Sequence, residues 1–223
     1  MPGGAIWQNA PAIALENGCY DGITTVAELK RHGNQGIGAF DQLDGEMVGV
    51  DGVFYRVTAD SVAHVPDDSE TLPFCMVTDF DGAAPVELPA EMRKDDLYPW
   101  LDSQVDEPNL FYSLRIEGTF HDVRSRALPR QEKPFPRLKE VEKVQSEYSY
   151  DHLEATMVGF RAPSYVGRIS PPAWHLHFVS ADRGYGGHVI AFEGCRAAIS
   201  LQCVERQEIR YPTASGFGSK PLT

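Results

Sequence analysis

The sequence WHLHF at residues 174–178 is followed, after seven intervening residues, by GGHVI at residues 186–190. His175 and His177 are two positions apart, so in a β-strand both side chains point to the same face. The intervening residues include serine, aspartate and glycine, which favour a chain reversal. A second strand beginning at His188 would bring a third imidazole beside the first two. The sequence therefore predicts a β-hairpin with three histidines on one face.

Three neutral imidazoles with a fourth position open form the ligand set of catalytic zinc, in which water or a substrate oxygen completes the shell. A single histidine on an apolar strand is usually a core residue, but three on adjoining strands favour a ligand set. Imidazole also binds iron, copper, nickel and manganese, so the spacing alone does not name the metal. We predict that His175, His177 and His188 bind one metal ion, with zinc favoured over iron.

The composition is that of a folded protein with one large domain or two smaller ones. The 223 residues are 42% hydrophobic and 23% charged, and the net charge is −12. Such an acidic chain is unsuited to nucleic acid or to anionic membranes. It has no apolar run of membrane-spanning length, no signal-peptide pattern and no Cys-x-x-Cys pair. We therefore expect a cytoplasmic protein that binds neither nucleic acid nor membranes.

Short strand and helix patterns alternate in the first part of the chain. Asp-Gly at residues 51–52 separates apolar runs at 46–50 and 53–57, which predicts a type I′ hairpin. Thr25 and Glu28 form a capping box that predicts the start of a helix, with Gly33 able to end it. Further expected elements are a strand at 72–78, a helix at 90–101, and strands at 111–116 and 119–124.

The second part of the chain predicts mainly strands. Three prolines within residues 129–136 indicate an irregular linker. A charged helical stretch at 138–148, with Val144 among its inward residues, precedes expected strands at 154–161, 165–169, 173–179, 188–193, 197–204 and 207–211. We expect an α+β fold. A mixed or antiparallel N-terminal sheet domain at residues 1–128 is followed by a β-barrel-like C-terminal domain at residues 129–223, which carries the metal.

Several motifs occur together in a fixed order. They are YDG at 20–22, GIGAF at 36–40, LDGEM at 43–47, GTF at 118–120, PRQEKP at 129–134 and the histidine block at 175–188. With these motifs the chain resembles the bacterial α-acetolactate decarboxylases along nearly its full length. The resemblance implies dimerisation through the N-terminal domain, hence a homodimer, and one Zn²⁺ per chain in the C-terminal domain.

The resemblance also implies roles for individual residues. His175, His177 and His188 would be the zinc ligands, Glu46 the active-site carboxylate and Arg126 the guanidinium beside the metal. The implied reaction is the decarboxylation of 2-acetolactate to acetoin, in which the metal stabilises an enediolate. The arginine would hold the substrate carboxylate or stabilise charge and feed a proton, and the glutamate would orient or relay the proton.

The residues alone leave these two roles open. A carboxylate such as Glu46 beside a hairpin is usually a solvated edge residue, and alternation places Arg124 and Arg126 on one strand face. Two departures from the family are visible. Ala39 stands where the family usually has threonine, and no carboxylate follows Glu208, although family members generally return a second glutamate towards the metal.

Three alternatives follow from the same residues. The departures support a homologue that holds zinc but has low or altered activity. A cupin-like three-histidine iron oxygenase is a second alternative, although cupins place a glutamate ligand where residues 180–182 are Ser-Ala-Asp. The third is a metal-stabilised binding module like a small DNA-associated domain. That domain is much shorter, and the negative charge does not suit it.

Overall fold

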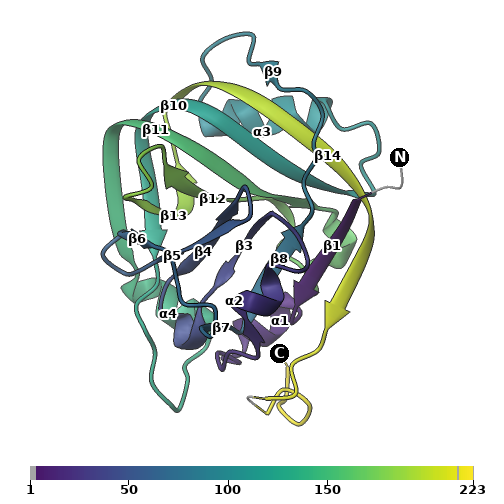
Figure 1. Ribbon diagram of the computed structural model, residues 1–223, viewed down its shortest axis with the longest axis vertical. Coiled ribbons are helices and arrows are strands. Elements are labelled where there is room, and N and C mark those ends of the chain that lie inside the picture. The colour runs from purple at the N-terminus through teal and green to yellow at the C-terminus, as the bar shows by residue number, and fades with distance from the viewer. Residues whose placement is uncertain (1–3, 215, 223) are drawn as a thin grey trace.

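One large β-sheet runs through most of the chain (Figure 1). The structure, a computed structural model, describes residues 4–214 and 216–222. Within these residues the sheet contains twelve strands in the spatial order β11-β12-β13-β10-β14-β1-β8-β3-β4-β5-β6, with β9 paired beside β14. These strands are β1 (Gly4–Asn9), β3 (Gln35–Ala39), β4 (Glu46–Val50), β5 (Val53–Val57), β6 (Ala63–His64), β8 (Phe74–Thr78), β9 (Val86–Glu87), β10 (Phe111–Ala127), β11 (Ser146–Ala162), β12 (Ala173–Ser180), β13 (Gly186–Ala191) and β14 (Gly194–Arg210). A separate small sheet pairs β2 (Thr24–Thr25) with β7 (Thr71–Leu72).

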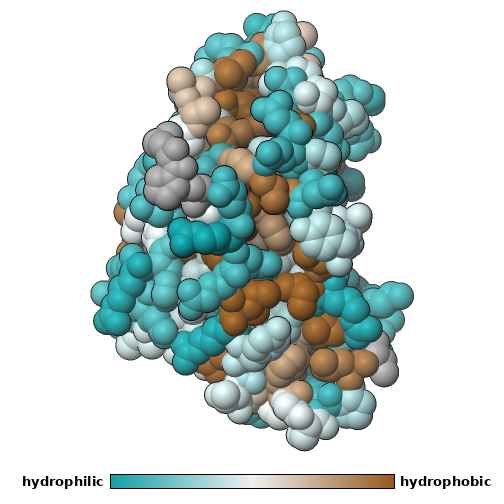
Figure 2. Space-filling model, turned by 90° about the vertical axis from the view of Figure 1, so that its right-hand side faces the viewer, coloured by the Kyte–Doolittle hydropathy of each residue, from teal (hydrophilic) through white to brown (hydrophobic). Residues whose placement is uncertain are grey.

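The helices are short, and the fold is mostly β-sheet. They are α1 (Ala12–Glu16), α2 (Val26–Leu29), α3 (Lys94–Ser103) and α4 (Leu138–Val141), with 3₁₀ turns η1 (Asp41–Leu43), η2 (Glu142–Val144) and η3 (Ser164–Val166). In Figure 1, α3 lies beside the long strands at the top, and α1, α2 and α4 lie at the lower end. No helix in the described ranges is long and apolar enough to cross a membrane. On the face to the right of Figure 1, hydrophobic side chains form a broken band between hydrophilic ones (Figure 2).

The longest strands organise the second part of the chain. β10, β11 and β14 each have 17 residues, and β10 pairs with both of the others. β11 also pairs with β12, β12 with β13 and β13 with β10, so these four strands pair in a closed ring. Phe120, Met157 and Phe178 from these strands share a buried cluster with Leu97 and Leu101 of α3. This apolar cluster therefore covers one face of β12.

The sheet folds back so that strands from the two parts of the chain pack together. Ile37 and Val48, from β3 and β4, share a buried cluster with Phe160 and Val179 of β11 and β12. The linker at residues 129–136 has no helix or strand, as its prolines predicted. Strands from both sides of this linker belong to the same sheet. The division into two domains and the barrel-like C-terminal domain remain predictions.

Two local predictions are confirmed in detail. β4 and β5 form the predicted hairpin, and Asp51 and Gly52 take positive φ angles of 52° and 77°, as a type I′ turn requires. The Thr25 hydroxyl accepts a hydrogen bond from the Glu28 amide over 3.1 Å, so the predicted cap begins α2. The helix ends at Leu29, before the predicted Gly33, and tighter turns follow it, in which the amides of Arg31 and His32 donate to carbonyls three residues back.

The prediction of two strands at 111–116 and 119–124 is wrong, because β10 is continuous through both. Gly118 lies opposite Ala155 of β11 and Ala197 of β14 in the middle of the sheet. Its missing side chain allows Arg196 and Ala197 of β14 to approach closely, so the glycine marks a crowded strand position and not a turn.

Other segments also differ from the sequence prediction. The helix predicted at 138–148 is limited to α4 and η2, since β11 begins at Ser146 in order to pair along β10. Val144 is consequently exposed, where the sequence predicted an inward side chain. The strand predicted at 165–169 does not form. The chain instead enters η3, and local backbone hydrogen bonds continue through residues 166–170. The last two predicted strands are one continuous strand, β14.

Candidate active site and metal centre

The predicted histidine hairpin is formed by β12 and β13. His177 lies opposite His188, and His175 is two positions away on β12. The ligand atoms of the three residues all lie within 4.8 Å of one another. Trp174 and Leu176, which alternate with the histidines, pack into the apolar cluster around α3. This alternation turns the imidazoles to the opposite side of β12.

Hydrogen bonding and burial prepare the imidazoles to bind a metal. Nδ1–H of His177 donates to the Met47 carbonyl over 2.9 Å, which directs Nε2 towards His175. The two Nε2 atoms are 3.3 Å apart, close to the separation of nitrogens bound tetrahedrally at ~2.0–2.1 Å to one zinc ion. Burial lowers the pKa of His177 to about 4, and it lowers the pKa values of His175 and His188 well below the usual range. The neutral donor set therefore fits a divalent metal ion.

Glu46 is the first residue of β4 and lies beside the histidines. Its side chain is buried, and Oε2 is 3.8 Å from Nε2 of His177. Burial raises the pKa of Glu46 from 4.5 to about 7; the Arg126 charge lowers it, and Glu142 adds to the rise. A carboxyl group with this pKa can both donate and accept a proton near neutral pH. Glu46 is thus not a solvated edge residue.

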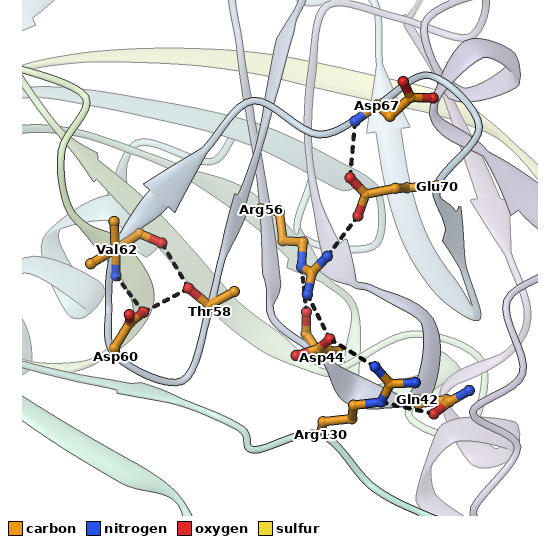
Figure 3. A network of polar contacts seen from close by, with 9 residues as sticks. All are labelled: Gln42, Asp44, Arg56, Thr58, Asp60, Val62, Asp67, Glu70 and Arg130. Atoms are coloured by element: carbon orange, nitrogen blue, oxygen red, sulfur yellow. Dashed lines mark hydrogen bonds and ion pairs between the residues drawn. The ribbon is translucent and has the colours of Figure 1, made fainter.

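A network of polar contacts holds the turn that leads into Glu46 (Figure 3). Arg56 of β5 donates to the Asp44 carbonyl over 2.7 Å and to its carboxylate over 2.6 Å. Arg130 from the linker donates to the side chain of Gln42 over 3.0 Å. Gln42 has a φ of 59°, a conformation that residues other than glycine rarely adopt. The contacts stabilise this turn and thereby fix where β4 begins.

Arg126 lies near the end of β10, opposite His188 of β13. The pairing with β13 shifts register between Arg124 and Ser125. Arg124 is exposed, whereas Arg126 lines the same cavity as the histidines. Pairing with β11 is regular through this part of β10, so both arginines share one strand face, as alternation predicts. Their positions along the strand separate them, since Arg126 stands opposite His188 and Arg124 stands opposite Ala191.

A cavity of about 210 Å³ opens beside the histidines. Its charged lining residues are Glu16, Glu46, Arg126 and Glu142. The rest of the wall consists of Ala12, Leu15, Ile37, Gly38, Ala39, Phe74, Leu128, Leu138, Pro171 and Pro172. Three of these charged residues are acids, and Arg126 is the cation in this lining that can pair with a small anionic molecule beside the ligand set. Ala39 contributes no hydroxyl to this wall, where the family resemblance leads one to expect threonine.

Glu142 and Gln145 are site residues that the sequence did not reveal. Nη1 of Arg126 donates to Glu142 over 3.1 Å and to Gln145 over 2.9 Å. Nε of Arg126 is buried and has no hydrogen-bond partner within the part of the chain that the structure describes. In the sequence, Glu142 belongs to a charged stretch typical of a solvated helix face. No local pattern indicates that η2 turns it towards the cavity.

Three converging imidazoles, a buried carboxyl group and a guanidinium around one cavity define a protein with a metal site suited to chemistry on a small anion. The family model for alpha-acetolactate decarboxylase matches residues 6–223. The chain belongs to the alpha-acetolactate decarboxylase family, which confirms the resemblance found in its motifs.

Similar proteins match nearly the whole chain. An alpha-acetolactate decarboxylase of Methanosarcina mazei is 38% identical over 97% of this chain and 75% of its own length. That of Methylococcus capsulatus is 37% identical over 95% of this chain and 82% of its own length. The crystal structure of alpha-acetolactate decarboxylase from Bacillus subtilis strain 168 has a TM-score of 0.93 and 34% identity, covering 98% of this chain and 93% of that one.

Proposed function

We propose that the chain decarboxylates 2-acetolactate to acetoin with one Zn²⁺ bound by His175, His177 and His188. The observation that carries this proposal is that the three imidazoles, Glu46 and Arg126 line the same small cavity in a chain of this family. When bound, the metal supplies Lewis acidity to the ketone and hydroxyl oxygens of the substrate. Zinc is proposed because three neutral imidazoles with an open position form its usual catalytic ligand set.

In this proposal, Arg126 binds the substrate carboxylate. A guanidinium pairs with a carboxylate through charge-assisted hydrogen bonds in a defined plane. Arg126 stands opposite His188 in the strand pairing, so it would hold the carboxylate next to the metal ligands. When the bond to this carboxylate breaks, carbon dioxide leaves and the electron pair stays on the carbon that carried it.

Glu46 is the proposed proton donor. The carbon left after loss of carbon dioxide must gain one proton to become acetoin. Because burial raises the pKa of Glu46 to about 7, a large fraction of its carboxyl groups are protonated at neutral pH. After donation, the carboxylate would regain a proton from solvent. Its position 3.8 Å from His177 supports this role, since that places it beside the ligand set.

The homodimer and the cytoplasmic location remain predictions, as do the residue roles above. The hydrophobic band seen in Figure 2 supports a protein partner on that face. Hydrophobic side chains that gather on a surface are typical of protein contacts.

The test is acetoin formation from racemic acetolactate by the purified protein, before and after chelator treatment and zinc restoration. Metal content is measured on the same sample. We expect chelation to abolish acetoin formation and zinc to restore it. Stoichiometric zinc without acetoin would contradict the proposal and favour a homologue with altered chemistry. Oxygen uptake that depends on ferrous iron would favour the three-histidine oxygenase.

A further inference from the structure

The guanidinium of Arg126 is held from one side only. Both of its hydrogen bonds within the described residues leave from Nη1, to Glu142 and Gln145. Nε remains buried without a partner in the same part of the chain. Two acceptors on one amino group fix the plane of a guanidinium and keep its other donors free.

The segment that carries Glu142 is itself firmly placed. Val141, the residue before it, is buried in a cluster with Tyr20, Ala39 and Leu128. This anchor lets η2 present the Glu142 side chain to the cavity, where it forms part of the lining. η2 itself has no buried residue, and the Glu142 side chain is 37% exposed, so the buried Val141 is what anchors this acid beside the cavity.

The second acceptor is also oriented. The amide nitrogen of Gln145 donates to Glu147 over 2.7 Å, which leaves its oxygen to accept from Arg126. Glu147 lies opposite Arg126 in the pairing of β10 with β11. A chain of polar contacts thus runs from Glu147 through Gln145 and Arg126 to Glu142.

We propose that Glu142 is a positioning residue that holds the Arg126 guanidinium in the orientation that receives the substrate carboxylate. The inference rests on the proposed function, because it takes the anion at Arg126 to be that carboxylate. Glu142 acts here through Arg126 and takes no part in bond breaking. Loss of Glu142 should therefore weaken the binding of carboxylates and leave the binding of neutral ligands unchanged.

Two ligands of similar size separate these effects. 2-Hydroxy-2-methylpropanoate carries a hydroxyl and a carboxylate, whereas 2,3-butanediol has hydroxyls and no charge. Their binding is measured by calorimetry on zinc-loaded protein, which requires no turnover. In Glu142→Ala we expect affinity for the hydroxy acid to fall about tenfold, the scale of one charge-assisted hydrogen bond. Affinity for the diol should not change.

Two further variants sharpen the test. Glu142→Gln keeps an oxygen that can accept from Nη1, so we expect about a threefold loss, intermediate between the wild type and Glu142→Ala. Glu140→Gln is the matched control, since it removes the same charge from the same segment. The Glu140 side chain is 57% exposed and pairs with Lys143, and it does not line the cavity. This control should bind both ligands as the wild type does.

Metal content and melting temperature are recorded for each variant. Equal weakening of the hydroxy acid and the diol would overturn the proposal, because it would show a general change in the cavity. Unchanged binding of the hydroxy acid in both Glu142 variants would also overturn it. Wild-type protein that makes no acetoin would refute the proposed function, while the ratio of the two affinities would still decide the role of Glu142.

Discussion

Lowering the pH should destabilise metal-free Glu46→Gln more than the metal-free wild type. Burial lowers the pKa of His177 from 6.5 to about 4. Below pH 6.5 the unfolded chain therefore binds a proton that the folded protein does not, and folding free energy is lost as the pH falls towards 4. Between pH 7 and pH 5 the shifted pKa of His177 alone lowers the unfolding free energy by about 2 kcal/mol. Burial shifts the pKa values of His175 and His188 downward as well, so they add to the loss.

Glu46 opposes this loss in the wild type. Its folded pKa of about 7 lies above the ordinary value of 4.5, so the folded protein takes up a proton before the unfolded chain does. Stability from this group is present below pH 4.5 and is lost as the pH rises through 7. Lowering the pH from 7 to 5 thus raises the contribution of Glu46 to the unfolding free energy by about 2 kcal/mol. Glu46→Gln lacks this contribution. Between pH 7 and pH 5 its unfolding free energy should therefore fall by about 2 kcal/mol more than that of the wild type.

Urea unfolding at pH 7 and pH 5 measures the difference. Chelator-treated wild type and Glu46→Gln are followed by fluorescence of the three tryptophans. Glu140→Gln serves as a control, since that exposed carboxylate should leave the wild-type pH response nearly unchanged. If the wild type and Glu46→Gln lose the same free energy between the two pH values, Glu46 is not a buried carboxyl group with a raised pKa, and the reasoning fails.

His188→Ala should lose both bound metal and acetoin formation because it removes one of three ligands. Elemental analysis that shows full metal content would contradict the ligand assignment. Arg126→Ala should keep its metal while kcat/KM falls at least about 100-fold, the scale of a lost charge-assisted contact to the reacting group. Full activity in this variant would show that Arg126 has no part in the mechanism. Arg56→Ala should lower the unfolding free energy by about 1–3 kcal/mol, since it removes the hydrogen-bond donor of partly buried Asp44 and leaves that carboxylate with the longer 3.7 Å pair to Arg130. It should also reduce kcat, and an unchanged urea midpoint would show that the turn before Glu46 does not need this contact.

The parts of the site that the sequence predicts are those encoded by short-range patterns. His175 and His177 share a face because of the strand period, and the turn residues after them bring His188 alongside. The Asp51 turn is predicted for the same reason, because its chemistry is local. These features need no knowledge of distant residues.

The rest depends on contacts between distant segments. Gly118 resembles a turn residue in the sequence, yet its two neighbouring strands make it the middle of a long strand. Glu142 resembles a solvated charge, and only the packing of Val141 turns it to the cavity. Arg126 is chosen over Arg124 because it stands opposite His188 when β10 pairs with β13, and no local period encodes that pairing.

The hydrogen bond from His177 to the Met47 carbonyl has a consequence for assembly and for sequence variation. The acceptor belongs to the backbone, so the side chain at position 47 can vary without releasing the imidazole. A one-residue insertion within β4 would displace this carbonyl and the neighbouring Glu46 together. The ligand hairpin is therefore completed only when a strand 130 positions away has docked in the correct register. Metal uptake during refolding would accordingly mark the docking of β4 against the ligand hairpin, and not the formation of the hairpin alone.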